Sequence, residues 1–581
     1  MKELCGTRDA RMTHKMYVWH TRYTFGARDA RMTHKMYVWH TKYTFGARDA
    51  PELVYDPSAW TECQMKPELP LYNGGILRNK LHVYKLIDDI NGDKVYSPTF
   101  SLENFSPASI YSFSSWVRVK NVDSALVTAK LKLDNQYPKC IGSVVAKKGC
   151  WSFLKGGFLW SAPSNSFQIH LTNSDVSQRN VEIEIINYSL QPFTEKEWRF
   201  NQFEGIKTER KRAVTIHVVD ENGNSLPNAA VKIDQISTDF PFGTMIASTI
   251  VGNLSYQEWF VKRFKATVFE NDLKWYKTEP LPGVFNYTIV DQMMQFVRKN
   301  KLLVRGHTMF WGNPTMIQDW VENMTVPQLQ KAMDGRIKSV MSKYRNEFFH
   351  WDIINELLHF NFYEKKLGPN ATLDMFKKVH RADPLVTLFL NEYNIVENCD
   401  PRINVDMYIE KFKELKKGGV KVAGIGLQSH FSAVNPAFMR AVLDKLATLK
   451  LPIWLTEVDV SNMYKQEEQA VYLEQILREA FSHPSVNGIM LWSALGRGGC
   501  YQMCLTDDKF QNLPTGDLID QLLLKEWKTG TKRGKTNELG SYNFRGFLGE
   551  YNVTVIYNRS ITHSYFSLGR GVETKHITVH V

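Results

Sequence analysis

The stretch at residues 348–356 reads FFHWDIINE, an apolar run that ends in Asn355 and Glu356. A second stretch at residues 453–460, IWLTEVDV, has the same form and brings Glu457 to the matching point. Short apolar runs are typical of strands that are buried on both faces, as in parallel sheets covered by helices. The two stretches therefore predict two buried parallel strands, each carrying a glutamate near its end.

Six more runs of this kind lie between residues 240 and 495, and helical stretches such as DQMMQFVRKN (291–300) separate them. The eight predicted strands are FPFGTMIA (240–247), KATVFEN (265–271), LLVRGHTMFW (302–311), FFHWDIINE (348–356), VTLFLNEYN (386–394), VAGIGLQSHF (422–431), IWLTEVDV (453–460) and GIMLWSAL (488–495). Eight strand–helix units in roughly 290 residues have the size and rhythm of a (β/α)8 barrel. We therefore predict an α/β fold with a (β/α)8 TIM barrel over residues 239–530.

Polar or aromatic residues cluster where these strands end, which is where the active site of such a barrel lies. They are Glu270 and Asn271, His307, Asn355 and Glu356, Gln428 and His430, Glu457, and Trp492. Glu356 and Glu457 follow the fourth and seventh strands, which face each other across the barrel mouth. Glycoside hydrolysis needs two carboxyl groups across the scissile bond. An isolated glutamate is usually a surface or helix-capping residue, but the matched positions favour a catalytic pair.

The segments that flank the barrel are strand-like. Residues 51–204 alternate apolar and polar residues, as in SIYSFSSWVRVK (109–120), and predict an all-β jelly-roll module. Residues 205–238 are predicted as a linker, GIKTERKR (205–212), followed by a β-hairpin. Residues 531–581 return to strand-like runs, which we expect to pack with residues 213–235.

The N-terminus repeats itself. Residues 6–25 and 26–45 differ only at two positions, and a third copy stops after GARDA (46–50). Two copies are too few to bury a core as a solenoid does. We interpret residues 1–50 as a recent duplication or a misassembled gene model, expect this segment to be disordered, and suggest that it replaces a signal peptide.

Charge and cysteine content exclude some classes of protein. The net charge is +12, but residues 1–50 hold ten Lys/Arg and only four Asp/Glu, so half of it comes from less than a tenth of the chain. We therefore expect no nucleic-acid partner. Seven cysteines are too few for a disulfide scaffold. Cys140 with Cys150, and Cys500 with Cys504, are close enough to pair, although free buried thiols are an equal alternative.

Eight N-x-S/T sequons favour a secreted, extracellular or cell-wall glycoprotein, although no signal peptide is visible. They start at Asn104, Asn187, Asn253, Asn286, Asn323, Asn370, Asn552 and Asn558. No apolar run is long enough to span a membrane, and we expect a monomer without a membrane partner. Lone glycine patterns such as GRGGC (496–500) lack the context of a nucleotide site, so we expect no cofactor and no metal.

Five motifs carry a resemblance to a known family. They are FENDLKW (269–275), RGHTMFW (305–311), WDIINE (351–356), GLQSHF (426–431) and LTEVDV (455–460). In this order they resemble the family 10 glycoside hydrolases, the endo-1,4-β-xylanases, over residues 240–530. The segment at 500–527 is similar to the plant branch of that family. The resemblance implies a retaining enzyme that hydrolyses xylan and xylo-oligosaccharides by double displacement.

The resemblance also implies a role for each site residue. Glu356 would be the general acid and then base, and Glu457 the nucleophile. Asn355 would bind the sugar 2-hydroxyl, His430 would orient Glu457, and Asp459 would support His430. Sugar hydroxyls would be bound by Glu270, Asn271, Lys274, His307 and Gln428. Trp311 and Trp492 would pack on sugar faces, although both, like His307, have the alternative role of buried structural residues.

Two departures from the family concern the subsites. Gly312 follows Trp311 where the family commonly has a histidine, and Tyr501 and Met503 stand where a second tryptophan is usual. These differences leave the catalytic pair intact and affect chain-length preference.

Residues 60–200 resemble a family 22 carbohydrate-binding module. The resemblance rests on YNGGILRN (72–79), FSSWVRV (113–119), GCWSFLKGG (149–157) and SLQPFTEKEW (189–198), and it makes Trp116 the candidate for sugar stacking. The late strand, SFQIHLTNS (166–174), lacks the usual aromatic and glutamate. A sugar-binding role and a structural role therefore both stay open.

Three alternative functions remain open on the sequence alone. A xylan endotransglycosylase would use the same two glutamates, with a sugar as acceptor in place of water. A non-catalytic cell-wall polysaccharide-binding protein would share the two-domain layout. A barrel hydrolase acting on cellulose or mannan would also carry glutamates on the fourth and seventh strands.

Overall fold

The structure, a computed structural model, describes residues 53–88, 92, 94–102, 109–133, 137–160, 167–496 and 498–581. The predicted disorder of the N-terminal repeat and the sequon at Asn104 lie outside the described residues. The described residues, from Leu53 to Val581, belong to one unit by their internal contacts.

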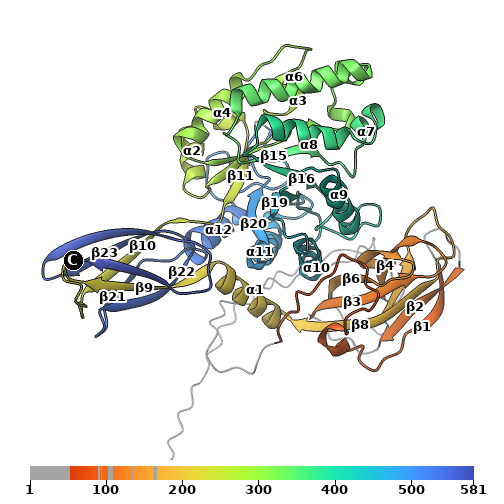
Figure 1. Cartoon of the computed structure of the whole chain (residues 1–581), viewed down its shortest axis with the longest axis horizontal. Coiled ribbons are helices and arrows are strands. Elements are labelled where there is room, and N and C mark those ends of the chain that lie inside the picture. The colour runs from red at the N-terminus through yellow and green to blue at the C-terminus, as the bar shows by residue number, and fades with distance from the viewer. Residues whose placement is uncertain are drawn as a thin grey trace, which may run out of the picture. The chain divides into compact units, whose positions relative to one another are not determined.

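The barrel is closed and parallel, so the predicted (β/α)8 fold is confirmed (Figure 1). The first strand pairs with the last, and two of the eight predicted strands are each divided in two. The strands are β11 (Phe242–Ile246), β12 (Ala266–Phe269), β13 (Leu303–Gly306) with β14 (Phe310–Trp311), β15 (His350–Asn355), β16 (Thr387–Glu392), β17 (Gly424–Leu427) with β18 (His430–Phe431), β19 (Ile453–Val460) and β20 (Val486–Leu491). Because all eight run in one direction, their C-terminal ends meet at one face.

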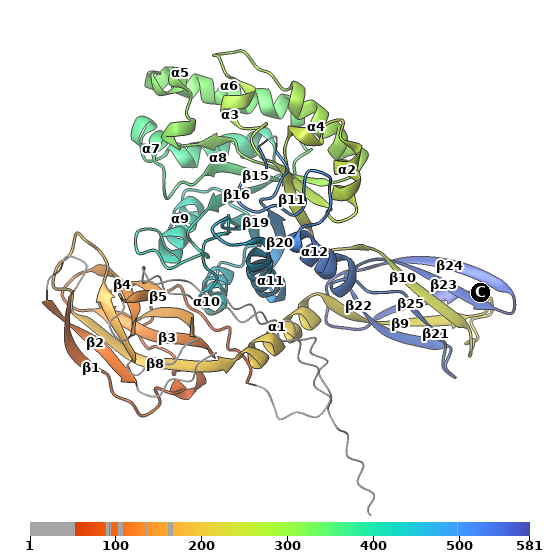
Figure 2. The same ribbon diagram turned by 180° about the vertical axis from the view of Figure 1, so that it is seen from behind.

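Helices cover the outside of these strands (Figure 1, Figure 2). They are α2 (Leu254–Val261), α3 (Trp275–Thr278), α4 (Thr288–Lys299), α5 (Asp319–Glu322), α6 (Val326–Tyr344), α7 (Phe362–Leu367), α8 (Ala371–Ala382), α9 (Val405–Lys417), α10 (Pro436–Ala447), α11 (Gln466–Ser482) and α12 (Pro514–Gln521), with the short 3-10 helices η2 (Ser248–Ile250) and η3 (Pro314–Met316) and the π-helix η4 (Leu522–Glu526). Local signals set their starts: the side chains of Asn404 and Asn435 cap α9 and α10. Within the described residues, no helix is both long and apolar enough to cross a bilayer.

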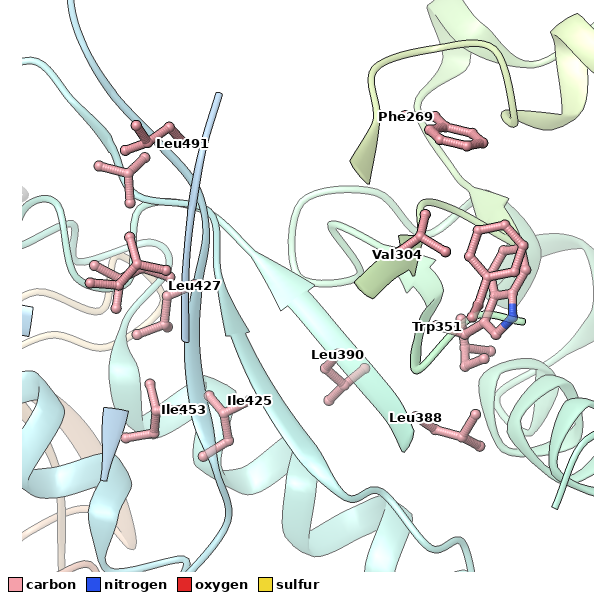
Figure 3. Packing of buried hydrophobic residues seen from close by; sticks show 14 of the residues in the cluster. Phe269, Val304, Trp351, Leu388, Leu390, Ile425, Leu427, Ile453 and Leu491 are labelled. Atoms are coloured by element: carbon pink, nitrogen blue, oxygen red, sulfur yellow. The ribbon is translucent and has the colours of Figure 1, made fainter. Parts of the chain in front are cut away.

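Alternate residues of each strand face two different cores. Side chains such as Val304, Leu388 and Ile453 pack outward against the helices, as Figure 3 shows. A second cluster, which includes Val268, Phe389, Trp454 and Met490, fills the barrel interior. The interior is therefore a packed base, and the polar ring lies above it. Gly488 is required beside Trp454, because a Cβ there would overlap the indole ring.

Residues 53–194 form the N-terminal module, and its predicted all-β character is confirmed. Two antiparallel sheets, ordered β1-β2-β7-β4-β5 and β6-β3-β8, enclose a core that includes Phe113, Val127 and Leu171. The elements are η1 (Leu71–Gly74), β1 (Val83–Asp88), β2 (Lys94–Leu102), β3 (Ser109–Val119), β4 (Ser124–Leu133), β5 (Lys139–Lys147), β6 (Ser152–Trp160), β7 (Phe167–Asn173) and β8 (Ile183–Thr194).

The predicted linker at 205–212 is wrong. Helix α1 (Glu195–Glu209) runs through most of it, and β9 begins at Lys211. Thr194 and Glu197 form a capping box at the helix start. Trp198 and Gln202 each donate a hydrogen bond to the Glu479 carboxylate on α11, at 2.8 and 2.7 Å. Trp198, Gln202 and Ile206, spaced four residues apart, form the buried face of α1. The many charged residues between and after them made this pattern hard to recognise in the sequence.

The predicted hairpin at 213–235 is also wrong. Strands β9 (Lys211–Val219) and β10 (Ala230–Thr238) lie in different sheets and pair instead with C-terminal strands. The sheets are β22-β9-β25 and β21-β10-β23-β24, formed with β21 (Lys532–Lys535), β22 (Ser541–Phe547), β23 (Gly549–Tyr557), β24 (Ser560–Leu568) and β25 (Lys575–His580). We call these seven strands the C-terminal sandwich. Both β9 and β10 bury one face in the core between the two sheets.

Three disulfides join the described cysteines. Cys500 pairs with Cys504. The sequence left open whether these two cysteines pair or remain free thiols. The suggested Cys140–Cys150 pair is wrong, because Cys150 bonds to Cys63 and Cys140 bonds to Cys399 in the barrel. The partners are 87 and 259 residues away in sequence, so proximity along the chain could not identify them.

Candidate active site

The structure gathers the predicted residues at the C-terminal ends of the barrel strands. Asn355 ends β15 and Glu356 follows it, while Glu457 lies within β19. Gln428 follows β17, and His430 begins β18. The closed parallel sheet explains this convergence, because strands that are distant in sequence end at one rim.

Glu356 is surrounded by neutral hydrogen-bond donors. Its carboxylate accepts bonds from Trp311 Nε1 at 2.8 Å, Gln428 Nε2 at 2.9 Å and Asn355 Nδ2 at 2.9 Å. Burial raises the pKa of Glu356, and the charge of Glu457 raises it further, although the bonds from Gln428 and Trp311 oppose this shift. The group is therefore suited to carry a proton.

The backbone of Glu356 is in the left-handed region, with φ at +60°. For a residue with a Cβ this conformation costs on the order of 1–3 kcal/mol, and such residues often lie at functional sites. Its amide N–H donates to the carbonyl of Asn391 at 3.0 Å, which holds the turn in place.

Groups that favour the ionised carboxylate surround Glu457. His430 Nε2 lies 3.5 Å from Oε2, and His307 Nδ1 lies 4.0 Å from Oε1. Burial alone would raise the pKa of Glu457. The charges of His307, His430 and Lys274 outweigh burial and hold that pKa at about 2. The carboxylate is therefore ionised and oriented, as a nucleophile must be.

Two amide side chains connect the carboxylates. Asn391 Nδ2 donates to Glu457 Oε1 at 2.7 Å and to Asn355 Oδ1 at 3.0 Å. Asn355 in turn donates to Glu356. Thr456 Oγ1 donates to Asn391 Oδ1 at 2.6 Å and fixes which way the amide faces. Sequence reasoning missed Asn391, although LFLNEYN (388–394) ends in polar residues just as the other strands do.

A buried ion pair between Arg305 and Asp352 holds the imidazole ring of His307 in place. Its Nδ1 lies 3.0 Å from Asp352 Oδ2, and Arg305 donates to Asp352 Oδ1 at 2.5 Å. All three side chains are at most 2% exposed. Asp352 was not predicted, although a charged residue inside the apolar run WDIINE was a visible signal.

His430 is supported by Asp459, whose Oδ1 lies 3.0 Å from Nδ1. Burial would lower the pKa of His430, but Asp459 and Glu457 outweigh it and raise that pKa well above the usual value. Gln502 Nε2 also donates to Asp459 Oδ1, at 3.4 Å. The exposed Tyr501 ring lies 5.8 Å from the His430 ring.

Three of the residues predicted to bind sugar hydroxyls, Glu270, Asn271 and Lys274, form a polar group near the two carboxylates. Lys274 Nζ donates to Asn271 Oδ1 at 3.0 Å, and Tyr276 donates to the same oxygen at 3.1 Å. Glu270 is partly exposed, and its pKa is raised mainly by burial. Lys274 Nζ also lies 4.8 Å from the centre of the Trp311 ring.

The two predicted tryptophans differ in access. Trp311 is partly exposed and donates to Glu356, so it lies at the exposed edge of the site. Trp492 is only 6% exposed and belongs to the cluster inside the barrel, where its ring lies edge-on to His307 at 5.4 Å. Trp492 therefore forms the base of the site and offers little free surface to a sugar.

A second acid–histidine pair borders the site and was not predicted. His359 Nδ1 lies 2.6 Å from Glu392 Oε1, and the Tyr393 ring stacks on the His359 ring at 3.6 Å. Glu392 is 1% exposed, and burial raises its pKa. Within the described residues, no group of His, Cys, Asp and Glu is arranged to hold a metal ion.

Trp116 does not offer a sugar-binding surface. Its side chain is 0% exposed and packs between Trp60 and Phe153, at ring distances of 5.3 and 5.0 Å. The prediction that Trp116 stacks on sugar is therefore wrong. Local alternation could not show which face of its strand would be covered by the segment around Trp60.

Comparison with known proteins gives one family and consistent relatives. The model of glycosyl hydrolase family 10 matches residues 232–497. Endo-1,4-beta-xylanase 5 of Arabidopsis thaliana is 36% identical over 512 residues, which cover 85% of this chain and 88% of that protein. Endo-1,4-beta-xylanase 4 of the same plant is 37% identical over 484 residues, covering 82% of each. Among solved structures, xylanase 10B from Thermotoga petrophila RKU-1 in complex with xylobiose has a TM-score of 0.45 at 25% identity, covering 50% of this chain and 95% of that one.

Proposed function

This chain belongs to glycosyl hydrolase family 10, and from that premise we propose that it is a retaining endo-1,4-β-xylanase that hydrolyses xylan by double displacement. The observation that carries the proposal is the opposite pKa shift of the two linked carboxyl groups, upward for Glu356 and down to about 2 for Glu457. Pairs of titratable groups whose surroundings push their pKa values apart identify acid and base roles.

In the first step the ionised Glu457 attacks the anomeric carbon of a xylose unit, while the proton of Glu356 passes to the departing glycosidic oxygen. Asn391 holds Glu457 Oε1, and His430 lies beside Oε2, so the nucleophile cannot turn away from the sugar. Asn355 donates to Glu356 and accepts from Asn391, which in turn donates to Glu457; we expect the 2-hydroxyl of the reacting sugar to bind Asn355.

In the second step the roles of Glu356 reverse. Once Glu457 is an ester its negative charge is gone, so one of the causes that raise the pKa of Glu356 is removed. The pKa of Glu356 then falls, and its carboxylate can take a proton from water as that water attacks the anomeric carbon. The ester bond to Glu457 breaks, and Glu457 leaves as a carboxylate. Glu356 thus gives up a proton in the first step and regains one in the second, which restores the starting state of the enzyme.

The experiment compares the full chain with its Glu457→Gln variant on xylan, cellulose and mannan. We expect release of reducing ends from xylan alone, loss of this activity in the variant, and a β-anomer as first product by NMR. Preferred cleavage of cellulose or mannan would overturn the substrate assignment. Absence of any cleavage would favour a non-catalytic wall-binding protein. Transfer products exceeding hydrolysis with a labelled xylo-oligosaccharide acceptor would identify a transglycosylase.

We also propose that the protein is extracellular. Three disulfides join all six cysteines in the described part of the chain, and disulfides persist mainly in oxidising compartments. A thiol count on the denatured protein, isolated from its natural source without reductant, tests this proposal. We expect the six cysteines to react only after reduction.

A further inference from the structure

The loop at residues 393–404, between β16 and α9, belongs to the barrel but is bonded to the N-terminal module. Cys399 in this loop forms a disulfide with Cys140 on β5. The loop directly follows the strand that supplies Asn391 to the active site. The module is therefore covalently attached to a loop at the catalytic face of the barrel.

A second contact fixes the far end of the same loop. Asp406, in the first turn of α9, accepts a hydrogen bond from the backbone N–H of Val145 on β5 at 3.0 Å. Its other oxygen lies 2.6 Å from Lys445 Nζ on α10. Strand β5 thus holds this loop and the start of the next helix through both a covalent and a polar contact.

The module itself is fixed to the barrel by a buried ion pair. Lys155 on β6 lies 2.7 Å from Asp444 on α10, with side-chain exposures of 0% and 1%. Asp444 also accepts a hydrogen bond from Tyr55 at 2.7 Å. A pair so buried requires a close and well-ordered contact, because a separated buried charge is strongly unfavourable. The module is thus a firm anchor for the loop.

Inside the loop, Glu397 connects this anchor to the catalytic residues. Its side chain is 4% exposed, and Oε1 accepts the backbone N–H groups of Ser429 at 2.8 Å and His430 at 3.2 Å. Ser429 has φ at +74°, in the left-handed region that residues with a Cβ rarely adopt. The carboxylate therefore stabilises a strained turn, and that turn directs His430 toward Glu457.

We infer that Glu397 is a positioning residue for His430, and that strand β5 of the N-terminal module anchors the loop that carries it. The link runs from β5 through the disulfide to Glu397, then to the turn at Ser429, and from His430 to the nucleophile. This role needs no sugar bound to the module, which is consistent with the burial of Trp116. The inference rests on the proposed function, because it assigns Glu457 as the nucleophile.

The test uses the full chain with E397A, E397Q and the double variant C140S/C399S. The matched control is C63S/C150S, which removes the disulfide that lies within residues 53–194 and does not reach the barrel. In E397A, His430 loses its fixed position, so we expect kcat to fall about 10- to 100-fold. The acidic limb of kcat/KM should move up by about one pH unit, because a displaced His430 no longer lowers the pKa of Glu457.

The other variants separate positioning from general damage. The amide oxygen of E397Q can still accept the N–H groups of Ser429 and His430, while its NH2 group would face the Val396 N–H that Oε2 accepts at 2.9 Å. The acidic limb of this variant should therefore lie closer to that of wild type than the limb of E397A does. C140S/C399S should shift the limb in the same direction as E397A but less, and C63S/C150S should not shift it. An unshifted limb in E397A, or equal shifts in the two disulfide variants, would overturn the inference. Should E397A fail to fold, the comparison of the two disulfide variants decides.

Amide hydrogen exchange gives a readout that does not depend on activity. We expect faster exchange at Ser429 and His430 in E397A and C140S/C399S than in wild type or C63S/C150S. A wild-type chain that cleaves no polysaccharide would refute the proposed function, while faster exchange would still show that Glu397 and β5 hold the His430 turn. Unchanged exchange with active wild type would refute the inference alone.

Discussion

Glu356 and Glu457 carry the same side chain and are buried to nearly the same degree, with 8% and 5% exposed, yet their surroundings differ in kind. Neutral N–H donors from Trp311, Gln428 and Asn355 surround Glu356. Glu457 instead faces His307, His430 and Lys274. Burial raises the pKa of both carboxyl groups, so the charge of the neighbours decides which group is ionised. Neutral hydrogen bonds hold the acid in place without removing its proton, whereas cations fix the nucleophile in its reactive form.

The largest effect should come from removing each carboxyl group in turn. Glu457→Ala removes the nucleophile, so we expect a loss on the order of 10⁴ to 10⁶ in kcat for every substrate. Glu356→Ala removes only the proton donor, so we expect a loss of roughly 10² to 10⁴ on xylan. With an aryl xyloside whose leaving group needs no proton, the first step in Glu356→Ala should be nearly normal.

The measurement is pre-steady-state release of the aryl group by both variants. A burst in Glu356→Ala and none in Glu457→Ala would match the assigned roles. The reverse pattern would mean that the two roles have been exchanged.

How far these surroundings could be predicted from the sequence depends on the range of the contacts. The barrel strands and the residues at their ends were predictable, because a buried parallel strand is a local apolar run that stops at a polar residue. The disulfide from Cys140 to Cys399 and the separate sheets of β9 and β10 were not, because they depend on partners far away in the chain. Asn391 was missed although its signal was local, and Trp116 was misassigned because burial by a distant segment leaves no local mark.

A smaller effect should follow from removing the amide that connects the two carboxylates. Asn391→Ala deletes the 2.7 Å bond to Glu457 and the 3.0 Å bond to Asn355. A hydrogen bond to a charged group contributes about 1.5–3 kcal/mol, so kcat should fall roughly 10- to 150-fold. The ionised form of Glu457 also loses a donor, and its pKa should rise.

Thr456→Val is the matched control for this change. It keeps the Asn391 amide and removes only the hydroxyl that orients it. Steady-state kinetics should therefore show a smaller loss in Thr456→Val than in Asn391→Ala. Equal losses would mean that the orientation of the amide, not its presence, separates the two carboxyl groups.

The cationic side of the comparison can be tested by His430→Gln, which retains a donor but removes the charge. The pKa of Glu457 should then rise from about 2 toward its ordinary value. Because the ionised form is required, activity should be lost at a higher pH as the solution is acidified, with the acidic limb of kcat/KM moving up by about one unit. Asp459→Asn should move it less, since His430 remains but is less strongly held in its charged form. An unmoved limb in His430→Gln would contradict the role of charge.

The smallest effect is expected on the neutral side. Trp311→Phe removes the N–H that donates to Glu356 at 2.8 Å while keeping an aromatic ring at the rim. That hydrogen bond lowers the pKa of Glu356, so its loss should raise this pKa. The acid then stays protonated to higher pH, and the basic limb of kcat/KM should move upward by a few tenths of a unit.

Trp527→Phe is the control for Trp311→Phe. Trp527 is a buried tryptophan that stacks on Phe242 at the start of β11, at the opposite end of the barrel, and should leave both limbs unchanged. If Trp311→Phe moved the acidic limb as far as His430→Gln does, a neutral donor would influence the nucleophile as strongly as a cation. The proposed difference between the neutral surroundings of Glu356 and the charged surroundings of Glu457 would then be wrong. A shift confined to the basic limb shows instead that each carboxyl group is tuned by its own neighbours, and that the shared amides Asn355 and Asn391 pass on little of the change.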